Sequence, residues 1–270
     1  MDIQTPGLEP DLAVDVVARS GAVSRRDALR KTALYGTALA ASPLALAALS
    51  KEAYAQAIPA GIQAVLRFAL TLEHLEYEFY RDGLATANLV AAVDRPLFET
   101  ILAHEGDHVR FLQRTLGLAQ GVGTGAAGRP ANGFDFTARG TLNTFQSYQT
   151  FLTVSQGLED TGVRAYKGQA PNLISSDAIL QAALQIHSVE ARHASAVRRL
   201  RGQKGWITGN MSDSAAIQAT YNGEEVVTQA GVNLQTALGG TYGANAVSEA
   251  FDEPLTDTQV LAIAGPFIRP

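Results

Sequence analysis

The sequence predicts an all-α protein, a four-helix bundle with one long crossover that is followed by a small C-terminal extension. Three observations support this prediction. Four segments repeat their apolar residues with helical spacing, the link between the second and third segments is long and rich in glycine, and the two pairs of segments share a motif. A period near 3.6 residues indicates amphipathic helices, and one long link is typical of bundles with a single crossover.

The four predicted helices form two hairpins. The short link inside each hairpin implies that its two helices run antiparallel. The glycine-rich crossover between the hairpins covers residues 117–140. The helices are expected at residues 61–83, 95–118, 144–166 and 176–201.

The two hairpins repeat one arrangement of Glu, Tyr and His. Each has a Glu on its first helix, a Tyr seven residues later and a Glu-x-x-His on its second helix. The interval from the first Glu to the Glu-x-x-His is 32 residues in one hairpin and 31 in the other. One Glu-x-x-His is common by chance, but two at nearly the same interval indicate a shared site. The residues are Glu73, Tyr80, Glu105 and His108 in the first hairpin, and Glu159, Tyr166, Glu190 and His193 in the second.

The Glu-x-x-His motifs interrupt apolar stripes that should face the core. A buried carboxylate without a partner is unfavourable or shifts its pKa until it is neutral, and several in one core repel each other. A pair of divalent cations removes both penalties. The sequence has no cysteine, so carboxylate and imidazole are the available ligands, and they suit iron, manganese or zinc.

With this motif the sequence resembles the ferritin-like superfamily of di-iron and di-manganese carboxylate proteins. A closer likeness, to twin-arginine-exported ferritin-like proteins related to plant desiccation-related proteins, rests on residues 70–80 (LTLEHLEYEFY) and 250–256 (AFDEPLT). The resemblance is firm over residues 60–201. It implies two metal ions, iron or manganese, as cofactors. The implied metal ligands are Glu73, Glu105, His108, Glu159, Glu190 and His193.

The resemblance also implies which ligands bridge the two metals and which bind one metal. Glu105 and Glu190 would bridge the two metals, whereas Glu73 and Glu159 would each bind one. The histidines of the two motifs would be terminal ligands.

Several neighbouring residues complete the expected site. Tyr80 and Tyr166 would donate hydrogen bonds that orient carboxylates. His187 lies one turn before Glu190 on the same helix face, and would contact the ligands without binding metal itself. Glu76 and Asp160 adjoin the single-carboxylate ligands and could replace them. Three further side chains are expected to take no part in the site. Glu78 is expected to be a solvated surface charge. His74 and His104 each adjoin an expected ligand but point about 100° away from it on an ideal helix.

The activities of this superfamily include iron oxidation by oxygen or peroxide and peroxide disproportionation. The resemblance therefore implies a ferroxidase-like or manganese-catalase-like reaction with oxygen or hydrogen peroxide, in defence against oxidative or desiccation stress. No catalytic residue beyond the metal centre is expected. The alternative is a metal-stabilised structural or stress-protective scaffold without turnover. The sequence leaves open the choice of iron or manganese, and whether chains associate into a homo-oligomer.

A zinc metalloprotease is a minor alternative. His104-Glu105-Gly106-Asp107-His108 matches the H-E-x-x-H motif of that class. The second hairpin, however, has Val189 in place of His104, so the shared element is only Glu-x-x-His. Residues 109–134 also contain no His, Asp or Glu that could serve as a third ligand.

Composition argues against a nucleic-acid partner. The formal net charge is -5, and a phosphate-binding face needs clustered Lys and Arg.

Residues 1–57 are predicted to be a twin-arginine-type signal peptide. Ser24-Arg25-Arg26-Asp27-Ala28-Leu29-Arg30-Lys31 precedes an apolar stretch, which ends in small-x-small sites for cleavage at 55 or 57. Ala28 and Arg30 replace the Phe and Lys of the twin-arginine pattern. We expect the twin-arginine translocon as a partner during export and a periplasmic or extracellular location. An uncleaved membrane anchor is the alternative.

The bundle is expected to occupy residues 58–201, and the extension residues 202–270. Tyr221-Asn222-Gly223-Glu224 is predicted to form a hairpin turn. Residues 256–264 are predicted to form a short last helix that stops at Gly265-Pro266. We expect the extension to pack on the bundle or to mediate contacts between chains.

Overall fold

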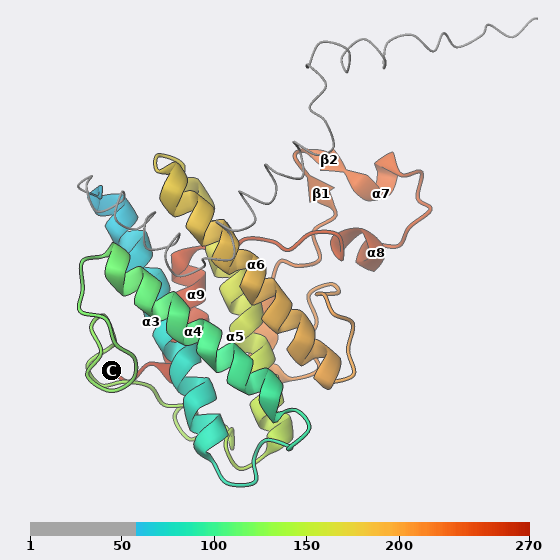
Figure 1. Cartoon of the computed structure of the whole chain (residues 1–270). Helices are drawn as coiled ribbons and strands as arrows, with labels where there is room; N and C mark the ends of the chain where they lie inside the picture. Colours follow the sequence, from blue (N-terminus) through green and yellow to red (C-terminus); the bar gives the residue numbers. More distant parts are fainter. Residues whose placement is uncertain (1–57) are drawn as a thin grey trace, which may run out of the picture. The chain divides into compact units, whose positions relative to one another are not determined.

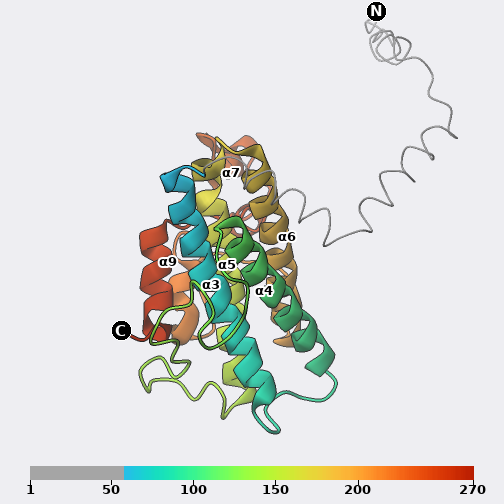
Figure 2. The same cartoon turned by 60° about the vertical axis from the view of Figure 1, so that its left-hand side comes forward.

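The computed structural model of the chain describes residues 58–270. Its main part is a bundle of four helices: α3 (Ala60–Ala85), α4 (Arg95–Thr115), α5 (Tyr148–Gln169) and α6 (Asp177–Leu200). Helix α3 packs against α4, α5 packs against α6, and α3 also contacts α5, as Figures 1 and 2 show. The predicted all-α bundle with two hairpins and one crossover is confirmed. The predicted signal peptide, residues 1–57, lies outside the described residues.

Aromatic side chains fill one part of the bundle core. The rings of Phe79 and Phe151 stack with centroids 4.9 Å apart, and Phe98 meets Phe151 edge-on at 5.0 Å. All three are fully buried, and burying each contributes roughly 1.5–3 kcal/mol. Because the rings come from α3, α5 and α4, this contact joins the two hairpins.

The crossover between α4 and α5 is irregular but firmly attached to the bundle. The Gln113 amide donates to the carbonyl oxygens of Gly121 and Ala127, at 2.8 and 2.9 Å. Arg129 forms an ion pair with Glu78 on α3, with an Nη2 to Oε2 distance of 3.0 Å. The prediction that Glu78 lies on the solvated surface is therefore wrong, because Arg129 and the crossover cover it and leave it only 3% exposed.

The C-terminal extension contains only short elements. One two-stranded antiparallel sheet pairs Thr228 with Asn233 and Gln229 with Val232. Within residues 58–270, no helix has the length and apolar character needed to cross a membrane. The elements are η2 (Ala215–Tyr221), β1 (Thr228–Gln229), β2 (Val232–Asn233), α7 (Leu234–Ala237), α8 (Ala244–Ser248), α9 (Asp257–Ala264) and η3 (Gly265–Phe267), with η1 (Ala170–Leu173) before α6.

Residues 221–224 do form a turn, in which the Glu224 amide donates to the carbonyl oxygen of Tyr221 at 3.1 Å, but a 3-10 helix and not a strand precedes it, so the predicted hairpin there is wrong. The hairpin turns at Ala230 and Gly231, both with positive φ (49° and 81°), as a two-residue turn with the twist of its strands requires. Glu224 instead directs its carboxylate to Arg164 on α5, at 2.7 Å. The predicted last helix is present as α9, where Thr256 and Gln259 form a capping box.

Buried charges hold the extension against α5. Arg164 is 1% exposed and, besides its ion pair with Glu224, donates from Nε to the carbonyl oxygen of Glu253 at 2.7 Å. The Leu255 amide in turn donates to the carbonyl oxygen of Arg164 at 3.1 Å. Helix α9 also packs on α5. The second hairpin and the extension therefore share one interface.

Gly168 permits this close approach, because a Cβ at that position would overlap the carbonyl oxygen of Leu255. Backbone cannot swing aside as a flexible side chain can. Gly168→Ala should therefore weaken the docking of the extension and destabilise the protein by roughly 1–3 kcal/mol. Thermal melting and limited proteolysis would show a lower Tm and earlier cleavage within residues 202–270.

Gly61→Ala on α3 is the matched control, since a Cβ there meets no described atom within 4 Å. Alanine favours helix more than glycine does, so this variant should melt at or above the wild-type temperature. Equal melting and equal cleavage of the two variants would contradict the proposed close contact at Gly168.

Candidate metal centre

The six predicted ligands meet inside the bundle, and all four helices contribute. The carboxylates are fully buried, whereas the two histidines are 9% and 5% exposed. The i, i+3 spacing in α4 and α6 places the Glu and His of each motif on one helix face. The residues are Glu73 on α3, Glu105 and His108 on α4, Glu159 on α5, and Glu190 and His193 on α6.

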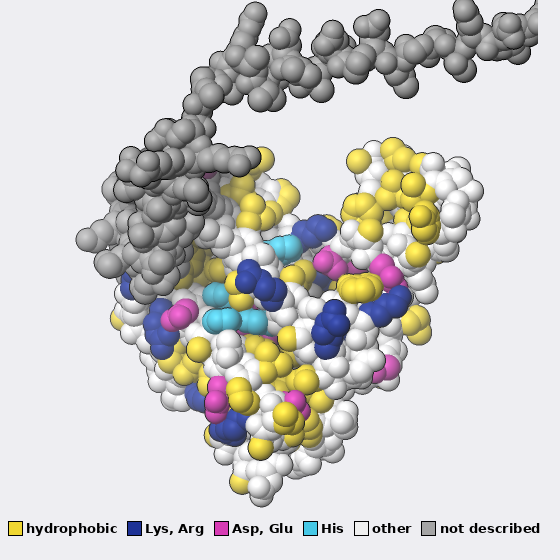
Figure 3. All heavy atoms as spheres, turned by 45° about the vertical axis from the view of Figure 1, so that its right-hand side comes forward, with side chains coloured by type: hydrophobic (Ala, Val, Ile, Leu, Met, Phe, Trp, Pro, Cys, Tyr) yellow, Lys and Arg dark blue, Asp and Glu magenta, His cyan; other side chains and the backbone are white. Residues whose placement is uncertain are grey.

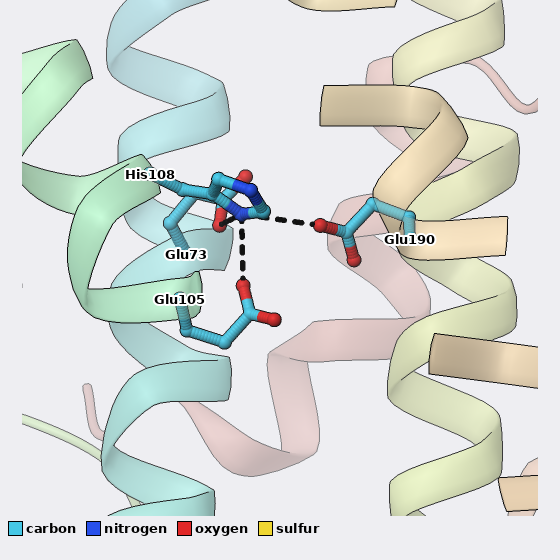
Figure 4. Close-up of side chains that lie close together, drawn as sticks. All are labelled: Glu73, Glu105, His108 and Glu190. Carbon is cyan, nitrogen blue, oxygen red and sulfur yellow. Dashed lines mark hydrogen bonds and ion pairs between the residues drawn. The ribbon is translucent and has the colours of Figure 1, made fainter. Parts of the chain in front are cut away.

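One donor group surrounds His108. Its Nδ1 lies 3.0 Å from Oε2 of Glu73, 3.1 Å from Oε2 of Glu105 and 3.3 Å from Oε1 of Glu190. Figure 4 shows the imidazole directed between these three carboxylates. The group thus joins α3, α4 and α6.

A second donor group surrounds His193. Its Nδ1 lies 2.9 Å from Oε1 of Glu105 and 3.2 Å from Oε2 of Glu159. Glu190 belongs to both groups, and within each group the donor atoms lie within 4.8 Å of one another. Glu105 presents one carboxylate oxygen to each histidine. Glu105 and Glu190 are therefore the two residues that the groups share, which is the position expected of bridging ligands.

The two tyrosines hold carboxylates across the hairpins. The Tyr80 hydroxyl donates to Oε1 of Glu159 and lies 2.7 Å from Oγ of Ser155. The Tyr166 hydroxyl donates to Oε1 of Glu73. Each tyrosine thus fixes the carboxylate of the opposite hairpin, and each carboxylate keeps its second oxygen for the donor group.

Charge interactions inside the cluster oppose the effect of burial. Burial alone lowers the pKa of a histidine, but Glu73 and Glu105 hold the pKa of His108 well above its ordinary value. Burial is likewise outweighed at His193, where Glu159 and Glu105 raise the pKa to about 11. Burial would raise the pKa of Glu105, yet both histidines bring it below its ordinary value. Without metal, these shifts favour an ionised Glu105 between two protonated histidines.

The other carboxylates of the cluster favour their protonated forms. Burial raises the pKa of Glu73 to about 7, although His108 acts against it. Burial, followed by the charge of Glu105, raises the pKa of Glu190 well above its ordinary value. Burial also raises the pKa of Glu159. The metal-free cluster therefore retains protons that bound cations would displace.

The residues present fit a pair of metal ions. Among residues 58–270, no well-aligned hydrogen bond reaches Oε1 of Glu105, Oε2 of Glu159, either carboxylate oxygen of Glu190 or Nδ1 of His193, although the imidazoles form ion-pair contacts with three of these oxygens and leave Oε2 of Glu190 with no partner. Each such atom normally costs roughly 1–3 kcal/mol, so a cluster of them is rare without a ligand. All of them belong to the donor group around His193. Carboxylate oxygen with imidazole nitrogen is a donor set that iron and manganese accept.

A further carboxylate, Glu76, adjoins the cluster without joining either donor group. It is 3% exposed, and burial together with the charges of Glu190 and Glu159 raises its pKa well above the ordinary value. Gly162 on α5 makes room for it, because a Cβ there would lie 3.2 Å from Oε1 of Glu76 and 3.1 Å from Oε2 of Glu190. In the sequence repeat Gly162 is the counterpart of Glu76, since each follows the first Glu of its hairpin by three residues.

Other residues considered from the sequence have different partners. Asp160 accepts from Nε of Arg198 at 3.1 Å and from the Tyr221 hydroxyl at 2.7 Å, so it joins the bundle to the extension. The structure gives His187 no hydrogen bond to the cluster, and its buried Nε2 has no hydrogen-bond partner among the described residues. His74 lies 3.2 Å, through Nε2, from the carbonyl oxygen of Ala127 in the crossover.

His104 is the cluster neighbour that sequence reasoning set aside. Its Nδ1 lies 2.9 Å from Nε2 of His193, on the far side of that ring from the donor group. Helix geometry correctly predicts that His104 points away from Glu105. Its partner, His193, lies on α6, so the sequence of α4 alone could not predict this contact. Neither donor group contains His104. A zinc site on residues 104–108 would need His104 and His108 in one group, and the structure does not bring them together in this way.

Comparison with known proteins agrees with this arrangement. A family model described as the ferritin-like domain matches residues 61–203, a range that covers the four bundle helices except for the first residue of α3, and that contains all six residues of the donor groups. No curated protein matches the chain. The matched range is more than half of the 270 residues. The chain belongs to the ferritin-like domain family.

Proposed function

We propose that this chain is a di-metal carboxylate protein, which holds two iron or manganese ions and carries out redox chemistry with oxygen or hydrogen peroxide in defence against oxidative or desiccation stress. One observation supports this above all. Two buried donor groups, each with three carboxylates and one histidine, share Glu105 and Glu190.

The charges of the site match two divalent cations. The four carboxylates of the donor groups carry four negative charges when ionised, which balance the four positive charges of two such ions. Glu105 and Glu190 would be shared by the two ions, while Glu73 and Glu159, which Tyr166 and Tyr80 orient, would each hold one. Bound iron or manganese would supply the electrons of the reaction and a coordination position for the oxidant.

The surface near the cluster favours a small reactant. His104 is exposed, whereas His193 and His108 behind it are only 5% and 9% exposed. Figure 3 shows histidine side chains reaching one face of the molecule, with Lys and Arg side chains near them. The carboxylates behind these imidazoles are fully buried, so a reactant that reaches the cluster past the histidines must be small.

Metal content and reactivity test this proposal together. Wild-type protein should bind about two iron or manganese ions per chain. The iron form should oxidise ferrous iron, or the manganese form consume peroxide, faster than a protein-free control. Glu105→Gln removes a ligand that the two ions share, so it should lower metal affinity and turnover roughly 10–100-fold or more. Plasma mass spectrometry and stopped-flow absorbance would measure the two effects.

Glu99→Gln is the matched control, because Glu99 lies on the same helix, is exposed and forms a surface ion pair with Arg95. It should leave both readouts unchanged. Bound metal that raises the melting temperature without any turnover would favour the scaffold alternative, since the cluster joins all four helices. No uptake of metal at all would refute the di-metal proposal.

The protonation of the cluster predicts an unusual pH dependence of stability. Folded Glu73 keeps its proton up to about pH 7, whereas the unfolded chain releases it near the ordinary value of 4.5. Folded His193 keeps its proton to about pH 11, against 6.5 when unfolded. In both cases the folded pKa is raised, so the stabilisation is present at low pH and is lost as pH rises. Glu105 acts in the opposite sense, but only below pH 4.5.

The free energy of unfolding of the metal-free protein should therefore fall between pH 5.5 and pH 8, by about 1.4 kcal/mol per pH unit for each proton retained, and the Tm should fall with it. Bound Mn²⁺ displaces these protons and should remove the fall. Burial also raises the pKa of Glu224 to about 7, but it lies outside the cluster and contributes with and without metal. The difference between the two melting curves thus isolates the cluster, and parallel curves would contradict the assignment.

We also propose export by the twin-arginine route to the periplasm or beyond, on the strength of Ser24-Arg25-Arg26 and the small-residue sites that end at 55 and 57. Intact mass of the exported protein should show a new N-terminus after residue 55 or 57. A mature protein that retains residue 1, or one that stays in the cytoplasm, would contradict this proposal.

A further inference from the structure

His104 makes a specific contact with one of the two histidines of the cluster. Its ring lies parallel to that of His193, with centroids 5.2 Å apart and an angle of 13° between the planes. Its Nδ1 is 2.9 Å from Nε2 of His193. His104 is exposed to solvent, whereas His193 is 5% exposed, so the pair runs from the surface to the cluster.

The position of the carboxylates settles which nitrogen of His193 faces a metal. Nδ1 is the atom near Glu105 and Glu159, at 2.9 and 3.2 Å, so the donor group uses Nδ1. A histidine that binds metal through Nδ1 carries its proton on Nε2. Two bare nitrogen lone pairs at 2.9 Å would repel, so the Nε2–H of His193 donates to Nδ1 of His104.

The other half of the cluster has no such contact. In the sequence repeat the counterpart of His104 is Val189, because each precedes the Glu of its Glu-x-x-His motif. Valine cannot accept a hydrogen bond. No hydrogen bond among residues 58–270 involves Nε2 of His108, whose Nδ1 faces the carboxylates. The two histidines are therefore held differently, although their donor groups are alike.

We propose that His104 is a positioning residue that makes the two metal positions unequal. By accepting the Nε2–H of His193 it fixes the tautomer and the ring orientation of that ligand, and it increases the basicity of Nδ1. Partners of this kind typically change metal affinity 10–100-fold. The position that includes His193 therefore binds a divalent cation more tightly and fills first. This inference rests on the proposed metal binding.

Calorimetric titration with Mn²⁺ tests the proposal without relying on turnover. Wild-type protein should show two binding steps of unequal affinity. His104→Val copies the residue of the second hairpin, so it should weaken the tighter step roughly 10–100-fold and leave the weaker step unchanged. His104→Asn should restore much of the difference, since Oδ1 of Asn lies about where Nδ1 of His does and can accept the same hydrogen bond.

Two further variants complete the experiment. Val189→His offers His108 the missing partner and should strengthen the weaker step. Asp107→Asn changes an exposed residue of the same helix, with a side chain 78% exposed, and should change neither step. Each metal-free variant should still unfold in a single cooperative transition, which separates the effect on metal binding from a folding defect.

The outcomes distinguish this inference from the proposed function. Two unequal steps that His104→Val leaves unchanged, or weakens equally, would overturn the role of His104 and leave the di-metal site standing. Failure of His104→Asn to recover any affinity would also overturn it, because the effect would not depend on the acceptor. A wild-type protein that binds no Mn²⁺ and no ferrous iron would overturn both.

Discussion

The need to compensate buried carboxylates governs the rest of this structure. Four of them converge at full burial inside the bundle, and two histidines cannot balance their charge. The structure responds in three ways: both imidazoles insert between carboxylates, two tyrosines donate to carboxylates of the opposite hairpin, and several oxygens remain free for cations. Because every bundle helix supplies part of this cluster, the cluster also fixes how the helices are aligned. If one helix shifted along its axis by one turn, its carboxylate would remain buried in the core without its partners.

The two hairpins use equivalent positions to attach the segments that follow them. Glu78 and Arg164 each lie five residues after the first Glu of their hairpin, and both are buried. Glu78 pairs with Arg129 in the crossover, and Arg164 pairs with Glu224 in the extension. Glu78 and Arg164 carry opposite charges, but each attaches an irregular segment to the bundle through a buried ion pair. The sequence repeat thus extends beyond the metal-binding pattern to the way in which the bundle holds its irregular segments.

Sequence reasoning succeeded where a feature is repeated or periodic. The helices follow from apolar spacing, and the six cluster residues follow from two motifs at nearly equal intervals. It failed where the partner lies far along the chain. Glu78 was predicted to be solvated because its partner Arg129 is 51 residues away in the sequence. A hairpin was predicted around Asn222-Gly223 because the ion pair between Arg164 and Glu224 joins distant parts of the chain. That Tyr80 would hold Glu159, and not the Glu73 of its own helix, also depends on how the hairpins pack.

The pair of Glu76 and Gly162 has a consequence for how such a bundle can be assembled. Two identical hairpins, associated as separate chains, would place the same residue at this point twice. Two glutamates would compete for one space, since even a Cβ on Gly162 would approach Oε1 of Glu76 to 3.2 Å, and two glycines would leave the fifth carboxylate out. A chain in which both hairpins are covalently joined can encode a different residue on each side. Fusion of the hairpins thus allows an asymmetric centre inside a nearly symmetric scaffold, which a homodimer of hairpins could not build.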